Sequence, residues 1–136
     1  MVDLTITATS VVPGTNARTE TGVAGETITA GQACYKAAAT GKWMKSDADS
    51  ATAEARAVGG VSLTASSLNQ PVVIQSKGDL TLGATLTVNT PYYLSGTAGG
   101  ICPIADVGTG EYLLQVGIAR TTAIIQVLPI ATGVAN

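Results

Sequence analysis

The chain has 136 residues, enough for one domain with a core of ordinary size. Its formal net charge is -2 and only 12% of its residues are charged, so no Lys- and Arg-rich surface is available to neutralise phosphates, which argues against nucleic-acid binding. Hydrophobic residues make up 46% of the chain but are mostly Ala and Val, with no Phe, a composition that favours thin β-layers over thick helical packing.

The low charge has two interpretations. One is a soluble β domain with a surface rich in Thr and Ser; the other is a surface that faces other protein chains in an oligomer or larger assembly. No run approaches the roughly 18 apolar residues of a membrane span, and "MVDLTITATS" lacks the basic and long apolar segments of a signal peptide. We therefore expect synthesis in the cytoplasm and no membrane partner.

Residues 1–22 are predicted to be an extended N-terminal arm followed by a linker. Leu4 and Ile6 alternate with polar residues at the period of a half-buried strand, and Pro13-Gly14 then indicates a turn before a polar, loop-like run. Such an arm either closes its own sheet or reaches a neighbouring subunit.

Residues 23–136 are predicted to form a single β domain. Strand-length runs alternate with turns rich in Gly, Pro, Asn or Thr, which indicates an all-β fold, a compact β-sandwich or barrel. At most one short helix is expected, over about residues 47–57, where an Ala-rich run ends at Gly59-Gly60; a polar loop is the alternative. The chain is expected to end in a short tail after the run "TAIIQVLPI".

The domain is predicted to contain two pseudo-repeats, about residues 27–65 and 85–123. When the chain is shifted by 58 positions, eight residues match without a gap, among them Tyr35 with Tyr93 and Gly41 with Gly99. Composition alone gives roughly three or four matches. The order of features is also shared: a strand, a turn, a strand with tyrosine, a glycine turn and a strand with a bulky residue.

The repeat favours an architectural role for the tyrosine strand "TPYYLSGTAGGI". Tyr93 has a counterpart in Tyr35, whereas Tyr92 is matched by Cys34. Because neighbouring side chains of a strand point to opposite faces, we expect Tyr92 to face outward if Tyr93 faces inward. An outward Tyr92 would be a candidate oligomer-interface residue, as would Trp43. Ordinary core packing is the alternative for both.

The sequence offers no recognisable catalytic or metal-binding constellation. It contains no His, which removes Ser-His-Asp and Cys-His catalysis and His-based metal sites. It has no phosphate-binding glycine motif, and its acidic residues are scattered through apparent turns. We expect no enzymatic activity, no cofactor or metal and no small-molecule substrate. Cys34 and Cys102 are expected to be buried thiols and not a disulfide.

Five stretches carry a resemblance to a known family: "ITAGQACY", "AVGGVSL", "QPVVIQSKGDLTL", "TPYYLS" and "LLQVGIARTTAIIQV". They resemble the small decoration, or cement, proteins of tailed-bacteriophage capsids over roughly residues 23–128. The second half is also similar to β-modules of phage head fibres and tail fibres. The long Thr-rich N-terminal arm and the second tyrosine depart from the cement pattern.

This resemblance implies a structural virion protein, made in the host cytoplasm and located on the capsid exterior. It implies a homotrimer that binds the major capsid protein and stabilises the shell by bridging capsid subunits. Within this chain, the expected capsid-contact residues are Val2, Leu4 and Ile6 of the arm. The alternative is a fibre module that binds a receptor or carbohydrate, for which Trp43 and Tyr92 are the expected aromatic platform, together with Tyr93.

Overall fold

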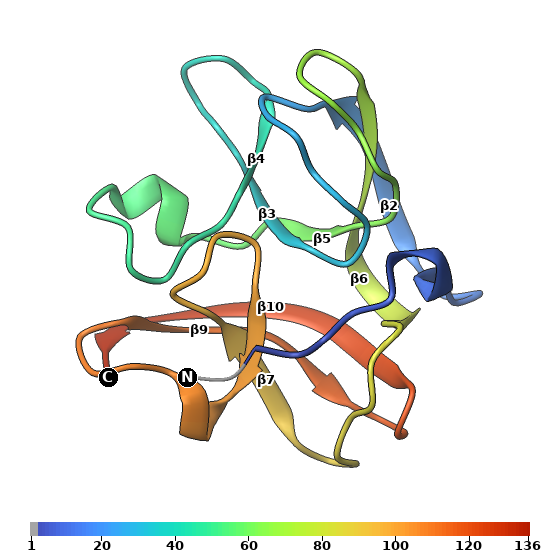
Figure 1. The fold of residues 1–136 in the computed structure, drawn as a ribbon, viewed down its shortest axis with the longest axis vertical. Helices are drawn as coiled ribbons and strands as arrows, with labels where there is room; N and C mark the ends of the chain where they lie inside the picture. The colour runs from blue at the N-terminus through green and yellow to red at the C-terminus, as the bar shows by residue number, and fades with distance from the viewer. Residues whose placement is uncertain (1–2) are drawn as a thin grey trace.

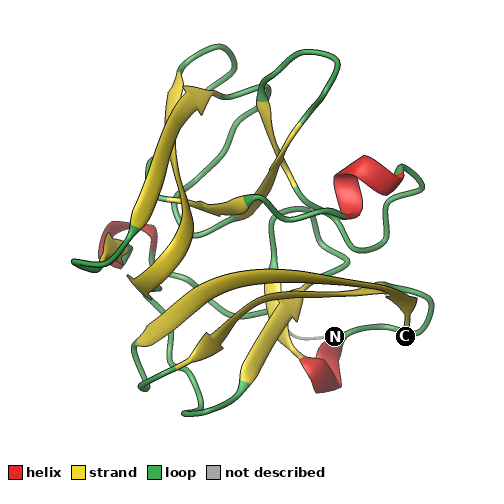
Figure 2. Ribbon diagram, turned by 180° about the vertical axis from the view of Figure 1, so that it is seen from behind, coloured by secondary structure: helices red, strands yellow, loops and turns green. Residues whose placement is uncertain are grey.

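The computed structural model describes residues 3–136, and its regular structure is almost entirely β (Figure 1). Figure 2 shows the same arrangement from behind, with short helical turns only at the margins of the strands. The strands are β1 (Val12–Pro13), β2 (Arg18–Val23), β3 (Ala33–Lys36), β4 (Trp43–Lys45), β5 (Gly60–Ser62), β6 (Pro71–Thr81), β7 (Pro91–Leu94), β8 (Ile101–Pro103), β9 (Tyr112–Ala119) and β10 (Ile124–Ala135). The helical pieces of the described range are the 3-10 turns η1 (Ala8–Ser10), η2 (Ala53–Arg56) and η3 (Ile104–Asp106). The predicted all-β class is confirmed.

The long strand β6 joins two halves of one antiparallel sheet. β1 and β2 run consecutively along one of its edges, while β5 and β10 pair along the other edge at different ends of the strand. The path through the sheet is β4-β3-β5-β6-β10-β9-β7-β8. Because β5 and β10 leave β6 at its two ends, the sheet curls into a half-barrel with β3, β4 and β5 in one half and β7, β9 and β10 in the other (Figure 1).

The two halves repeat each other ladder by ladder. In the β3–β4 hairpin Tyr35 pairs with Met44, and in the β7–β8 hairpin Tyr93 pairs with Cys102, both 58 positions later. Cys34 of β3 pairs with Gly60 of β5, and its counterpart Tyr92 pairs with Gly117 of β9. The pseudo-repeat expected from the sequence is therefore present in the strand pairing itself.

The remaining ladders show that β6 belongs to both units. Its first half, residues 71–77, closes the first unit: Gln75 pairs with Val61 of β5 and with Thr19 of β2. Its second half, residues 78–81, opens the second unit by pairing with β10, where Gln126 stands in the place of Gln75 and pairs with Ile118 and Asp79. Each unit thus has five strands, and its first strand pairs with its last.

Left-handed backbone positions recur at the turns of both units. Gly31 has φ +89° and its counterpart Asn89 has φ +61°, and each donates its N–H to the carbonyl of the strand that closes the turn, Ser62 O at 2.8 Å and Ala119 O at 2.8 Å. Positive φ is reached readily by Gly and, among other residues, most often by Asn and Asp. The repeat therefore conserves backbone geometry where the residue type differs.

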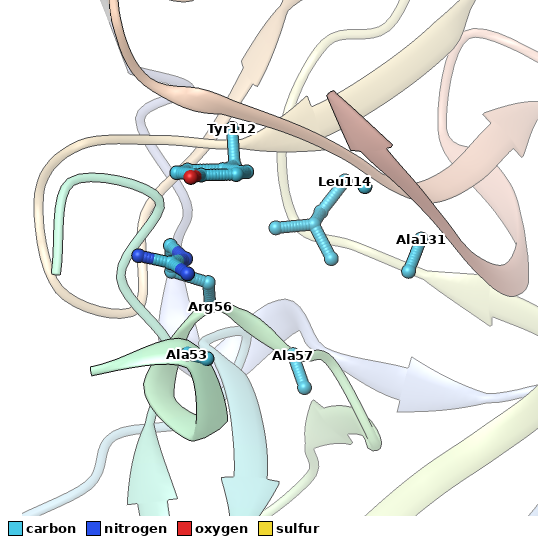
Figure 3. A pocket seen from close by; sticks show the side chains of 7 residues that line it. Ala53, Arg56, Ala57, Tyr112, Leu114 and Ala131 are labelled. Atoms are coloured by element: carbon cyan, nitrogen blue, oxygen red, sulfur yellow. The ribbon is translucent and has the colours of Figure 1, made fainter. Parts of the chain in front are cut away.

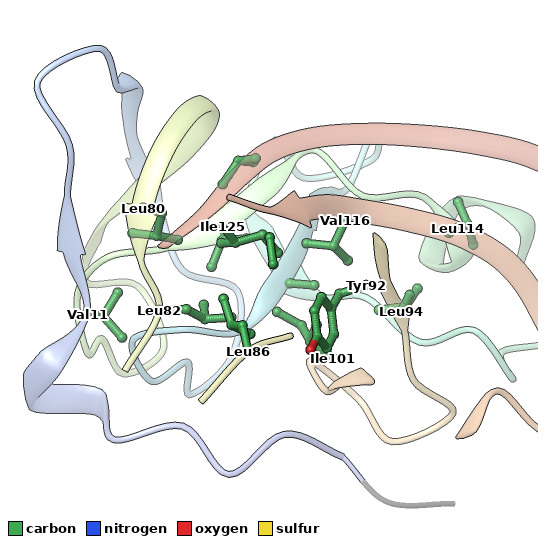
Figure 4. Packing of buried hydrophobic residues seen from close by; sticks show 14 of the residues in the cluster. Val11, Leu80, Leu82, Leu86, Tyr92, Leu94, Ile101, Leu114, Val116 and Ile125 are labelled. Carbon is green, nitrogen blue, oxygen red and sulfur yellow. The ribbon is translucent and has the colours of Figure 1, made fainter. Parts of the chain in front are cut away.

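Apolar side chains of both units form the interior. The larger of two clusters lies between the two halves of the sheet (Figure 4) and includes Val61, Leu80, Leu82, Leu94, Ile101, Val116, Ile125 and Val127, all 1% exposed or less. The smaller one lies within the first unit and consists of Ala24, Ile28, Cys34, Trp43, Val72 and Ile74. Burial of each large aliphatic side chain stabilises the fold by about 1.5–3 kcal/mol.

One local expectation is met and two require revision. At most one short helix was expected over about residues 47–57, with a polar loop as the alternative, and the segment is a loop with only the turn η2 (Ala53–Arg56). Residues 18–22 of the predicted linker belong to strand β2, which is held on β6. The expected C-terminal tail is instead the second half of β10, which pairs with β9 as far as Ala135.

Candidate functional site

An open pocket of about 410 Å³ lies between η2 and the β9–β10 hairpin. Figure 3 shows Ala53, Arg56 and Ala57 on one wall and Tyr112, Leu114 and Ala131 on the other. A smaller hollow of about 160 Å³ shares Ala57, Leu114 and Ala131 with it, so the two form one groove along the inner side of β10. The walls are mostly small or apolar, and this groove therefore suits an apolar side chain or an extended segment.

The polar end of the groove is formed by Arg56 and Tyr112. The Arg56 guanidinium carbon lies 3.9 Å from the centre of the Tyr112 ring, a cation–π arrangement visible in Figure 3. One guanidinium nitrogen, Nη1, also donates a hydrogen bond to Ser50 O at 3.1 Å. The ring is thus covered on one face, and the guanidinium is held in a fixed orientation with further N–H groups available.

The end of β10 is an exposed strand without charges. Residues 130–136 are all exposed, with Ile130 at 48% and Val134 at 57%, and no charged residue follows Arg120 in the sequence. Among the described ladders, residues 128–135 pair with β9 alone, and β9 is joined to them with two register shifts. Sheet edges are usually protected by charges, proline, bulges or a covering element; here Pro129 and the two register shifts provide such protection, and no charge does. This is the surface that best fits the binding of another chain.

Nothing in the described part of the chain groups three or more His, Cys, Asp or Glu residues as a metal site. Glu111, the one buried acid in that range, accepts a hydrogen bond from the Gly108 N–H at 2.7 Å and so closes its own turn. The groove contributes apolar contact, one stacked guanidinium and backbone groups. This chemistry is that of binding through contact area and hydrogen bonds.

The expected capsid-contact residues of the arm lie on their own domain. Leu4 and Ile6 are half-buried and pack against the larger cluster. The Leu4 N–H donates to Ile101 O at 2.8 Å, and the Ser95 hydroxyl donates to an Asp3 carboxylate oxygen at 2.5 Å. Val2 lies outside the described residues. The predicted alternation holds over residues 4–7 and ends at the exposed Ala8, and among the described residues no named strand forms before β1.

The two aromatic residues named as interface candidates are core residues of this chain. Trp43 is 5% exposed and Tyr92 is 3% exposed. Tyr92 points into the larger cluster (Figure 4), where its hydroxyl oxygen accepts a hydrogen bond from the Thr87 N–H at 2.9 Å. The two tyrosines face opposite sides as expected, but it is Tyr92 that faces inward, which is the core-packing alternative, and Tyr93 is the half-exposed member of the pair, as is its counterpart Tyr35.

Both cysteines are free and buried, as expected. Burial raises the pKa of the Cys34 thiol to about 12, with a further contribution from the negative charge of Glu26. Burial likewise raises the pKa of Cys102 to about 12, assisted by the Asp3 carboxylate. A thiol with so high a pKa holds its proton at neutral pH, so neither sulfur is a thiolate in the folded chain.

Sequence reasoning missed the groove and the end of β10. Arg56 was placed in a helix or loop and Tyr112 in a strand, and nothing in their spacing shows that these two side chains meet.

None of the described helical turns is long and apolar enough to cross a bilayer. No protein-family model matches the chain, and no curated protein matches it either.

Proposed function

We propose that this chain is a structural virion protein that binds the outside of a tailed-phage capsid and stabilises it by bridging capsid subunits. The observation that carries the proposal is the exposed, uncharged end of β10 with the groove beside it. An unpaired strand edge binds another chain through main-chain hydrogen bonds, and an adjacent apolar groove accepts its side chains. The sequence resemblance to capsid decoration proteins supports the choice of partner, the major capsid protein.

The composition supports the same function. Ile130 and Val134 are exposed on a strand that carries no charge over its whole length. Such a surface is expected where another protein covers it in the assembled particle. Standard interfaces bury about 800 Å² on each partner, and contacts repeated over a shell sum to a large reinforcement. A homotrimer on the capsid exterior, expected from the resemblance, is part of this proposal.

The alternative of a fibre module that binds carbohydrate loses two of the three rings of its predicted platform, which leaves only the half-exposed Tyr93. Trp43 and Tyr92 are buried, so their rings cannot stack on a sugar without unfolding of the core. The remaining ring beside a pocket, Tyr112, is covered on one face by Arg56. We therefore propose the capsid-binding function alone.

The test is co-sedimentation with capsids assembled without this protein. The wild-type chain is expected to pellet with the capsids and to saturate. The double variant Ile130→Lys, Val134→Lys places two charges on the edge and is expected to weaken binding by about tenfold or more. A matched control, Leu68→Lys with Val88→Lys, changes two residues of similar exposure, 57% and 45%, away from β10 and is expected to bind like the wild type.

Two results would contradict the proposal. One is a wild-type chain that does not pellet with capsids at any concentration. The other is equal binding by the β10 variant and the control variant, which would show that the end of β10 takes no part in the contact.

A further inference from the structure

The end of β10 repeats the sequence of β2. Residues 132–135 read Thr-Gly-Val-Ala, and so do residues 21–24. The strand pairing sets the two stretches in equivalent places. Thr19, in the first strand of the first unit, pairs with Gln75, and Asp79, in the first strand of the second unit, pairs with Gln126. The first strand of the first unit is therefore equivalent to residues 78–81, with a shift of 60 positions. The last strand of the first unit is equivalent to β10 with a shift of 51.

Adding the two shifts aligns the start of the first unit with the last residues of the given sequence. Residues 78–81 continue β6 beyond the last strand of the first unit, and residues 129–132 continue β10 beyond the last strand of the second unit. The two continuations are therefore equivalent. The combined shift is 111 positions, and it places Thr21 on Thr132 and Ala24 on Ala135. β10 therefore ends with the sequence of a first strand.

In β2 this sequence is used for packing. Gly22 lies against Trp43, so close that a Cβ atom would stand 2.5 Å from the indole Nε1. Ala24 is fully buried, donates its N–H to Gln70 O at 2.8 Å and accepts a hydrogen bond from the Asn69 N–H at 2.8 Å. Only glycine and a small residue fit these two places.

In β10 the same residues have nothing to pack against. A Cβ atom at Gly133 would meet no atom within 4 Å, and residues 132–135 are all exposed. Their ladder to β9 has a register shift between Ala131 and Ala135, and the Thr132 hydroxyl donates to Leu113 O at 2.7 Å. A glycine and an alanine that match a tightly packed site are thus presented on an exposed, irregularly paired strand.

We propose that residues 130–135 of one copy take the place of β2 on β6 of a second copy. Thr132, Gly133 and Val134 would then pair with Val73, Val72 and Pro71, as Thr21, Gly22 and Val23 do within the chain. Gly133 would lie against Trp43 and Ala135 would fill the place of Ala24. The proposal rests on the proposed function only in taking the end of β10 as a protein-binding strand: the exchange is the contact that this strand makes between free copies, and the capsid protein takes the place of the second copy when it binds.

The exchange restores most of the contacts that it breaks. Five of the six residues of β2, all except Gly22, are exposed, and the incoming strand replaces their ladder to β6 and fills the buried place of Ala24. The donor strand gives up the backbone hydrogen bonds of Asn136 with Gly110 and Glu111. Within one chain the end of β10 does not reach this site, because Ile124–Val127 pair with β6 on the edge opposite β1 and β2. Donor and acceptor differ, so the contact is head-to-tail and gives a closed ring or an open chain of copies.

Disulfide trapping in the purified full-length chain tests the exchange without capsids. A negative result would therefore count against the exchange and not against the proposed capsid binding. The variant Thr132→Cys, Val73→Cys is oxidised under mild conditions and analysed by non-reducing electrophoresis and intact mass. We expect cross-linked dimers and larger species, several times more abundant than in the parent chain, whose two cysteines are buried. A discrete ring size and a ladder of sizes both support the exchange.

Two controls make the result decisive. Thr21→Cys with Val73→Cys is expected to form a disulfide within one chain and to hold β2 in place, which leaves the protein monomeric in sedimentation. Thr132→Cys with Val88→Cys reports random collision, since Val88 is exposed and lies in the second unit, away from the β2 site. The proposal is overturned if Thr132→Cys, Val73→Cys yields no more multimer than this collision control while the β2 control cross-links fully.

Discussion

The indole of Trp43 lies directly against Gly22, where a Cβ atom would stand 2.5 Å from Nε1. The same ring meets Gly59, where a Cβ atom would stand 2.8 Å from Cζ3. Trp43 therefore occupies a slot whose walls require two glycines, one in β2 and one just before β5. Its Nε1 is buried with no hydrogen-bond partner among the described residues, so the ring is held by packing.

Gly22→Ala is expected to lower the free energy of unfolding by about 1–3 kcal/mol, because the added methyl group overpacks the indole. Chemical denaturation followed by far-UV circular dichroism measures this change, because Trp43 is the one tryptophan of the chain and is itself replaced in the cycle below. In a double-mutant cycle with Trp43→Leu, whose smaller side chain leaves room, the cost of Gly22→Ala is expected to shrink. An equal cost in both backgrounds would show that Gly22 is needed for some other reason.

Gly60 and Gly117 are equivalent in the two units and are expected to respond alike to substitution. A Cβ atom at Gly60 would strike the carbonyl oxygen of Gln75, and one at Gly117 would strike that of Gln126. Since backbone cannot move aside as a flexible side chain can, each change to Ala should cost about 1–3 kcal/mol of stability. Thermal unfolding of the two single variants checks this; a large cost at one site and none at the other would contradict the structural repeat.

The double variant Leu4→Ala, Ile6→Ala distinguishes the two roles of the N-terminal segment. Both side chains are half-buried against the core, so we expect a loss of roughly 1–4 kcal/mol in the free energy of unfolding. Differential scanning calorimetry and capsid co-sedimentation are measured on the same preparation. Unchanged stability with lost capsid binding would assign these residues to the capsid contact that the sequence predicted, and not to the domain.

The buried thiols predict a loss of stability at alkaline pH. The pKa of Cys34 and of Cys102 is about 12 in the folded chain, against a value of 9.0 for an ordinary thiol. The folded state therefore holds these protons more tightly than the unfolded state, and their contribution to stability is complete below about pH 9 and declines as the pH rises toward 12. Burial also raises the pKa of Tyr35, which adds to the same decline.

Denaturation midpoints between pH 7 and the alkaline range measure this slope. The variant Cys34→Ala, Cys102→Ala is the control and is expected to lose stability less steeply with pH, although its absolute stability is lower. Identical slopes for the parent and the variant would show that the thiols do not titrate with folding. At pH 8 the parent's thiols should react with a disulfide reagent only after the chain is unfolded.

The sequence predicted the hairpins of the repeat because their spacing is uniform. β3, β4, β7 and β8 keep a shift of 58 positions, so Tyr35 and Tyr93 align without a gap. The connection after Ser62 is longer than the one after Ala119, and the shift falls to 51 at Gln75 and Gln126. A comparison at the single shift of 58 therefore could not show that β6 ends one unit and begins the next, nor that residues 132–135 repeat residues 21–24.

The candidate site was less accessible to sequence reasoning. The periodicity of "TPYYLS" fixes that Tyr92 and Tyr93 face opposite sides but not which side is the core, and burial resolved this in favour of Tyr92. The end of β10 was expected to be a tail because "ATGVAN" is rich in small and polar residues; its pairing with β9 depends on contacts distant in sequence. Arg56 and Tyr112 meet only through the curl of the sheet.

Cryo-electron microscopy of the native phage particle tests the central claim most directly, because it shows where the chain lies and what covers the end of β10. The account predicts density for this half-barrel on the capsid exterior, with Ile130 and Val134 in contact with another protein chain. Density at the tail instead, with the end of β10 open to solvent, would contradict it.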